Sequence, residues 1–108
     1  MSLFLEYLQF IINIANYIID DGLEDEAHQL ISNTIRAISY AYELDIHVAY
    51  DKASDRYLGA MVIIPDTAEL FMTEYFTPYG QGVNVIYVSC NGGEFKELKE
   101  GEHIDKKD

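Results

Sequence analysis

Carboxylates are the residues of this sequence whose number and spacing are best suited to chemistry. The chain carries 19 Asp and Glu residues against 7 Lys and Arg residues, a formal net charge of −12. Nine acids between positions 20 and 55 form the candidate binding set: Asp20, Asp21, Glu24, Asp25, Glu26, Glu43, Asp45, Asp51 and Asp55. Up to Asp51 the only basic side chain is Arg36, so we expect a negative field over this half of the folded domain.

This charge argues against some partners and favours others. Nucleic-acid binding relies on Lys and Arg to neutralise phosphates, and anionic membrane surfaces attract basic segments. We therefore expect neither nucleic acid nor membrane as a direct partner. A basic protein is favoured instead, including the DNA-binding face of another protein. The simpler alternative is that acidity only keeps a small domain soluble.

Catalytic and metal-binding patterns are not recognisable in the sequence. His28, His47 and His103 have no His or Cys three or four residues away, as a zinc site requires. The acids from Asp20 to Glu26 offer oxygen ligands for Ca²⁺ or Mg²⁺, but they lack the ladder and closing Glu of an EF-hand. No Gly-rich loop joins a strand to a helix to hold a phosphate. We expect no enzyme activity, no cofactor and no metal.

Two helices are predicted in the first half, and they must position most of these acids. Residues 2–20 are apolar except for one stripe spaced 3, 4, 3, 4: Glu6, Gln9, Asn13, Asn16 and Asp20. Such a helix either lies at the centre of the domain or lends a second apolar face to a partner or a dimer. Residues 25–43 have the spacing of an amphipathic helix. The short link between them predicts an antiparallel pair.

The second half predicts strands. Residues 45–51 alternate with one buried face, and residues 56–64 are apolar on both faces, which predicts a central strand. Residues 83–89 and 94–98 predict a hairpin through Asn91-Gly92. Residues 66–76 fit a helix or a strand equally well. The fold class is therefore α+β: two N-terminal antiparallel helices packed on one face of a four- or five-stranded antiparallel sheet. We expect a single domain over residues 1–100 and a solvated tail over 101–108.

The cysteine content and the N-terminus predict a cytoplasmic protein. Cys90 is the only cysteine, so no intrachain disulfide can form and a reducing compartment fits. The N-terminus has no basic region followed by a cleavage site. The apolar run from Leu3 to Ile19 is interrupted by polar residues and lies at the short limit for a membrane span. We interpret it as a buried helix.

One stretch resembles a known family. His47-Val48-Ala49-Tyr50-Asp51, followed by Ser54-Asp55 and a closing hairpin through Asn91-Gly92, is similar to the phage uracil-DNA glycosylase inhibitors over residues 45–98. The resemblance implies helices first and an antiparallel sheet after. It also implies inhibition by imitation of DNA, through carboxylates placed like phosphates and an apolar pocket between helix and sheet. The acidic edge strand of that family has no clear counterpart here beyond the Glu24-Asp25-Glu26 turn, and residues 66–82 look like an insertion.

Three hypotheses follow. The first is an acidic inhibitor from a phage or mobile element that occupies the basic groove of a DNA glycosylase, restriction enzyme or CRISPR effector. The second is an immunity or antitoxin protein that neutralises a basic nuclease toxin by the same physics. The third is an oligomerising structural domain, with a homodimer formed through the first helix.

Overall fold

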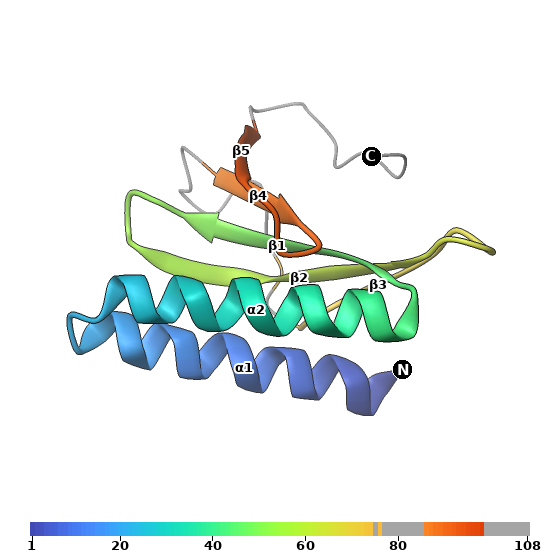
Figure 1. Cartoon of the computed structure of the whole chain (residues 1–108), viewed down its shortest axis with the longest axis horizontal. Coiled ribbons are helices and arrows are strands. Elements are labelled where there is room, and N and C mark those ends of the chain that lie inside the picture. The colour runs from blue at the N-terminus through green and yellow to red at the C-terminus, as the bar shows by residue number, and fades with distance from the viewer. Residues whose placement is uncertain (75, 77–85, 99–108) are drawn as a thin grey trace.

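The computed structural model describes residues 1–74, 76 and 86–98, and its elements follow the order expected from the sequence. The elements are α1 (Ser2–Asp20), α2 (Glu24–Tyr42), β1 (Asp45–Asp51), β2 (Arg56–Ile64), β3 (Glu69–Met72), β4 (Ile86–Cys90) and β5 (Phe95–Leu98). The strands form one antiparallel sheet in the order β3-β2-β1-β4-β5. Both helices lie on one face of it (Figure 1). The predicted α+β fold is confirmed, with five strands.

The core lies between the helix pair and this face of the sheet. Leu8 and Ile12 of α1 and Ile31 of α2 are almost completely buried, as are Ile46 and Val62 of the sheet. Residues of this core recur every three or four positions along the helices and every second position along the strands. Each element therefore presents one row of apolar side chains to the others. Removal of this apolar surface from water is the main force that holds the two layers together.

The sheet differs from expectation at its centre. We expected β1 to bury one face only, but β1 is the middle strand of the sheet, and both of its faces are buried from Ile46 to Asp51. Strand β2 is an inner strand, as its apolar sequence predicted. The undecided segment 66–76 contributes β3 over Glu69–Met72, which pairs with β2. Residues 83–85 and the predicted tail 101–108 lie outside the described residues.

Two glycines permit tight turns, one between α1 and α2 and one between β4 and β5. Gly22 has φ of +86° directly after α1, where its N–H bonds to the Ile19 carbonyl at 2.8 Å. Gly92 has φ of +78° in the predicted Asn91-Gly92 turn, and Asn91 is also positive at 53°. A Cβ on Gly92 would lie 2.5 Å from the Ser32 carbonyl oxygen, so only glycine lets this turn reach α2.

Helix α1 has one face in the core and one face in solvent. By length and hydropathy alone it could cross a membrane, a test that a core helix of a water-soluble protein also passes. Here Leu8, Ile12 and Ala15 pack in the core cluster. Within the polar stripe of this helix, Asn16 is buried. The helix is therefore a structural part of the domain.

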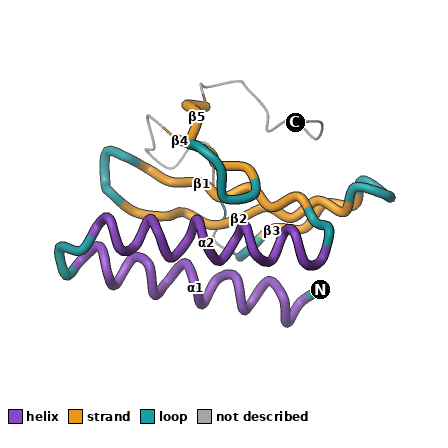
Figure 2. Tube along the Cα trace, in the orientation of Figure 1, coloured by secondary structure: helices purple, strands orange, loops and turns teal. Residues whose placement is uncertain are grey.

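The connections between α1, α2, β1, β2 and β3 lie at two opposite ends of the molecule. Figure 2 shows the α1–α2 and β1–β2 turns at one end, and the α2–β1 and β2–β3 turns at the other. Because α2 has 19 residues, its two ends are separated by about 28 Å at 1.5 Å per residue. Acids in these four turns therefore fall on one of two well-separated surfaces.

Candidate protein-binding site at the acidic end

Seven of the nine candidate acids lie at one end of the molecule, which we call the acidic end: Asp20, Asp21, Glu24, Asp25, Glu26, Asp51 and Asp55. They come from the α1–α2 turn, the first turn of α2 and the β1–β2 turn (Figure 1). An ion pair joins two of these segments, with Arg56 Nη1 2.9 Å from Asp20 Oδ1. Arg56 and Lys52 are the basic residues within these segments. Carboxylates far apart in the sequence thus share one surface.

Glu43 and Asp45 do not belong to this surface. They lie in the α2–β1 connection, at the opposite end of α2. Glu43 ends the helix in a left-handed conformation, with φ of 53°. Asp45 is half-buried, and its Oδ1 accepts a hydrogen bond from Asn91 Nδ2 at 3.2 Å. The candidate set therefore separates into a group of seven and a pair.

Asp51 supports the acidic end without being exposed on it. Its side chain is buried, and its Oδ1 accepts a hydrogen bond from the Ala53 N–H at 3.1 Å. Its Oδ2 accepts a second from the Ser54 hydroxyl at 2.8 Å. An aspartate that bonds the backbone two residues later is typical of a turn. Asp51 thus fixes the β1–β2 turn, and we remove it from the contact surface.

Asp55 links the β1–β2 turn to α2. It has φ of 56°, and its Oδ1 accepts a hydrogen bond from the Tyr50 hydroxyl. A hydrogen bond with Asp55, together with repulsion from its charge, raises the pKa of the exposed Glu24 carboxyl. Two carboxylates close together disfavour double ionisation. The Glu24 carboxyl at the start of α2 is therefore easier to protonate than a free glutamate.

An aromatic cluster lies beside these carboxylates, between α2 and the sheet. His28, Tyr50, Tyr57 and Phe95 have ring centroids 5.0 to 6.5 Å apart. His28 Nδ1 and the Tyr57 hydroxyl oxygen are 2.6 Å apart, which joins the helix to β2. The pKa values of Tyr50 and Tyr57 lie well above 10, and burial is the main cause of this increase. Both phenols therefore stay protonated at neutral pH.

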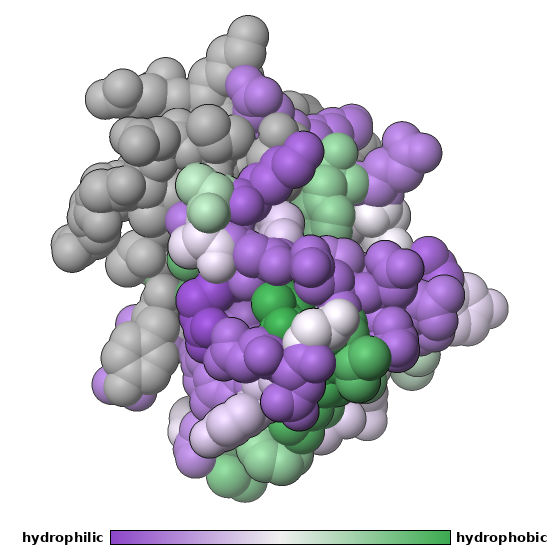
Figure 3. Space-filling model, turned by 90° about the vertical axis from the view of Figure 1, so that its left-hand side faces the viewer, coloured by the Kyte–Doolittle hydropathy of each residue, from purple (hydrophilic) through white to green (hydrophobic). Residues whose placement is uncertain are grey.

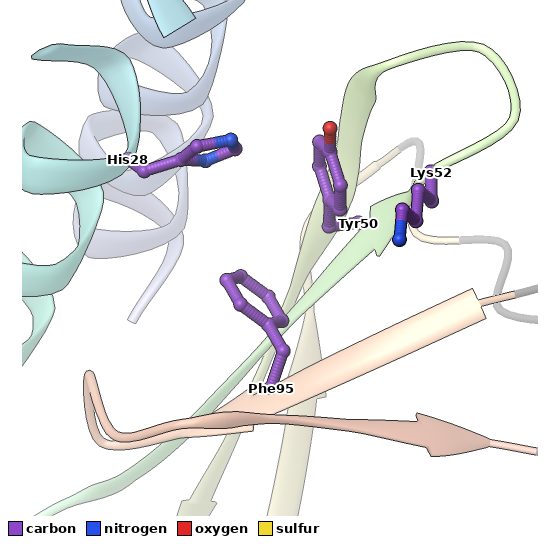
Figure 4. A pocket seen from close by; sticks show the side chains of 4 residues that line it. All are labelled: His28, Tyr50, Lys52 and Phe95. Carbon is purple, nitrogen blue, oxygen red and sulfur yellow. The ribbon is translucent and has the colours of Figure 1, made fainter. Parts of the chain in front are cut away.

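A pocket of about 430 Å³ opens among these side chains. It is lined by His28 from α2, Tyr50 and Lys52 from the β1 end, and Phe95 from β5. Figure 4 shows the His28, Tyr50 and Phe95 rings converging from three different elements. Its volume lies in the lower part of the range of small-ligand pockets. The acidic end thus combines a charged rim with an aromatic recess.

Asn16 anchors α1 to this end. Its Nδ2 donates to the Tyr57 carbonyl at 3.1 Å, and the Tyr57 N–H donates to its Oδ1 at 2.8 Å. The sequence pattern put Asn16 in the polar stripe of residues 2–20 and assigned no contact to it or to His28; Asn16 is buried and His28 is half-buried. One signal was present, because Asn16 lies four residues after Ile12 and three before Ile19, which are both core positions.

The described surface at the acidic end is mostly hydrophilic around a smaller hydrophobic area (Figure 3). Within the part of the chain that the structure describes, no three His, Cys, Asp or Glu side chains are placed to hold a metal ion. Comparisons with protein families, characterised proteins and solved structures found no match to this chain.

Proposed function

We propose that this protein is a cytoplasmic inhibitor that binds a basic, nucleic-acid-processing protein through its acidic end and occupies the surface where that protein holds nucleic acid. The observation that carries this proposal is the convergence of carboxylates from three separate segments on one end. Acidity that served solubility alone would not need this concentration. The proposal treats these carboxylates as substitutes for phosphates.

The exposed acids are held by regular elements or tight turns. Asp21 follows the last turn of α1, while Asp25 and Glu26 lie in the first turn of α2. All three are exposed. Because their backbone is fixed before binding, little conformational entropy is lost when a basic groove meets them. Their field also accelerates encounter with a positively charged partner.

The aromatic pocket supplies a second kind of contact. A side chain that protrudes from the partner would enter between α2 and the sheet, against the His28, Tyr50 and Phe95 rings. The resemblance to uracil-DNA glycosylase inhibitors implies this combination of phosphate-like carboxylates and a pocket between helix and sheet. Uracil-DNA glycosylase is therefore the first enzyme to assay, with restriction enzymes and CRISPR effectors after it.

A basic nuclease toxin is the alternative partner, because it offers the same charge and the same kind of groove. An immunity or antitoxin protein would use the same surface by the same physics. The identity of the captured protein distinguishes the two functions: an enzyme of repair or defence indicates an inhibitor, and a cognate toxin indicates immunity.

The proposal is tested by capture from a bacterial lysate on the immobilised protein, with elution by duplex DNA and separately by salt. The variant D21N/D25N/E26Q removes three charges from the acidic end. The matched control E43Q/D66N/E69Q removes three charges from the opposite connections. We expect wild type and control to retain one basic protein that duplex DNA elutes, and the acidic-end variant to lose it. Equal retention by all three proteins would overturn the proposal.

A further inference from the structure

The outer face of α1 carries an apolar stripe that the domain leaves exposed. Leu3, Tyr7, Phe10 and Tyr17 are 81%, 48%, 60% and 74% exposed, and Ile14 is half-buried between them. The spacing along the stripe is 4, 3, 4, 3, which is the heptad repeat of helices that pair along their length. The inner face of the same helix is fully used by the core. The stripe is therefore a second apolar surface of α1.

From this stripe we infer that α1 is the interface of a symmetric homodimer, in which two copies of the helix pair antiparallel about Phe10. The two ends of the stripe are equidistant from this residue, since Leu3 and Tyr17 lie seven positions away on either side, and Tyr7 and Ile14 lie three and four positions away. A twofold axis at Phe10 places Phe10 against its own copy and Leu3 against the second copy's Tyr17. Each surface then complements itself, as a twofold interface requires.

Charge selects a second copy in this orientation. Glu6 is the only charged residue from Ser2 to Ile19, so two chains of net charge −12 meet here with little repulsion. Antiparallel pairing sends the two acidic ends to opposite poles of the dimer, whereas parallel pairing would place them side by side. It also brings Asp20 and Asp21 of each copy toward the other α1 N-terminus. That terminus has no acid in its first turn and no side-chain cap, so its dipole is available to them.

The exposed area suits a modest dimer. The four most exposed side chains offer on the order of 500 Å² per copy, if a fully exposed aromatic presents about 200 Å². Flanking atoms of Glu6, Gln9 and Asn13 bring this to roughly the 600 Å² per copy at the lower limit of specific interfaces. The dimer does not require a partner at the acidic end, although Asp20 and Asp21 belong to that end and also lie near the second copy. If both hold, the dimer presents one acidic end at each pole.

The test is the molar mass of the purified protein, measured by light scattering up to about 100 µM chain, a range that detects micromolar dissociation constants. We expect wild type to be dimeric at the upper limit. Phe10→Glu places two like charges on the twofold axis and should raise the dissociation constant at least about tenfold. Tyr40→Glu, which adds the same charge at an aromatic position of α2 that is 87% exposed, should remain dimeric. A monomeric wild type, or a dimeric Phe10→Glu protein, would overturn the inference.

The orientation is tested by crosslinking in a Cys90→Ser background, so that the introduced cysteine is the only thiol. Diamide should couple two Phe10→Cys chains rapidly, because residue 10 meets its own copy at the axis. Asn13→Cys should couple slowly, because the two copies of residue 13 lie about 9 Å apart along the axis. Comparable rates for the two variants would overturn the antiparallel register. A wild-type monomer that sediments with phosphatidylcholine vesicles would overturn the dimer and assign the stripe to lipid.

Discussion

The acidic end and the outer face of α1 are adjacent surfaces built on opposite physical principles. At the acidic end, carboxylates are held by an ion pair, by turn hydrogen bonds and by an aromatic cluster that links α2 to the sheet. Along the outer face of α1, apolar side chains stand exposed on a helix whose only charged residue before Asp20 is Glu6. The acidic end suits a basic protein, and the outer face of α1 suits a second copy of this chain.

This difference explains how a chain of net charge −12 can carry an apolar surface beside an acidic one. The charges are concentrated where α1 ends and α2 begins, and the body of α1 is nearly neutral. Salt and charge substitutions should therefore act on one surface, and apolar substitutions on the other. The predictions below test this separation, beginning with the link between the two surfaces.

The largest effect is expected at Asn16, through which α1 holds the acidic end. Asn16→Ala leaves the Tyr57 N–H and carbonyl of β2 without their partner in a buried site. Each unsatisfied buried group costs about 1–3 kcal/mol, so we expect a loss of about 3 kcal/mol in the free energy of unfolding. Urea unfolding measures it. Asn13→Ala, at an exposed position, should change stability by less than about 0.5 kcal/mol, and equal losses would contradict the anchoring role.

The next largest effect is that of salt, which should weaken binding at the acidic end more than self-association along α1. Between about 0.05 and 0.5 M NaCl the screening length falls severalfold, so affinity for a basic partner at the acidic end should fall at least about tenfold. Self-association along α1 should weaken less than twofold, because the burial of apolar surface drives it. Titration calorimetry at the two salt concentrations measures the first affinity, and light scattering measures the second. A salt-insensitive affinity for the basic partner would argue against charge-driven binding.

Alkaline pH should destabilise the aromatic cluster. The pKa of Tyr57 is raised in the folded state chiefly by burial, so the folded protein keeps this proton when the unfolded chain releases it. The stability that the protonated Tyr57 contributes is therefore complete below pH 10. It is lost as the pH rises from there toward the pKa of Tyr57 in the folded protein. We expect up to about 1.4 kcal/mol of lost stability per pH unit in that window. Urea unfolding of Tyr57→Phe should show a shallower dependence, and an identical slope would contradict this cause.

The smallest effect on stability is expected from removal of the Asp55 charge beside the Glu24 carboxyl. Asp55→Asn keeps an oxygen to accept the Tyr50 hydrogen bond and suits the positive φ of this position. It removes the charge that raises the Glu24 pKa, so that pKa should fall toward its ordinary value. We expect Tm at neutral pH to rise by about 2 °C, measured by circular dichroism. A lower Tm would show that the Asp55 charge stabilises the turn.

The sequence predicted the elements well because both helices and the first strands have clear hydrophobic periods. The nine acids chosen from the sequence include the seven that meet at the acidic end, but also Glu43 and Asp45, which lie at the opposite end of α2. The sequence did not distinguish Asp51, whose carboxylate bonds within a turn, from the exposed acids. A buried and an exposed aspartate in a polar turn have the same local sequence pattern. The sequence pattern assigned no contact to Asn16 or His28, because the distant partner of a polar residue cannot be deduced from local spacing. Their partner, Tyr57, lies 41 and 29 residues away.

The measurement that tests the central claim most directly is displacement of labelled duplex DNA from the captured basic protein, followed by fluorescence polarisation. If the acidic end occupies the nucleic-acid surface, wild type and E43Q/D66N/E69Q should lower the polarisation to that of free DNA as they saturate the partner. D21N/D25N/E26Q should displace the DNA only at a concentration at least about tenfold higher. DNA that stays bound while wild type saturates the partner would contradict the claim.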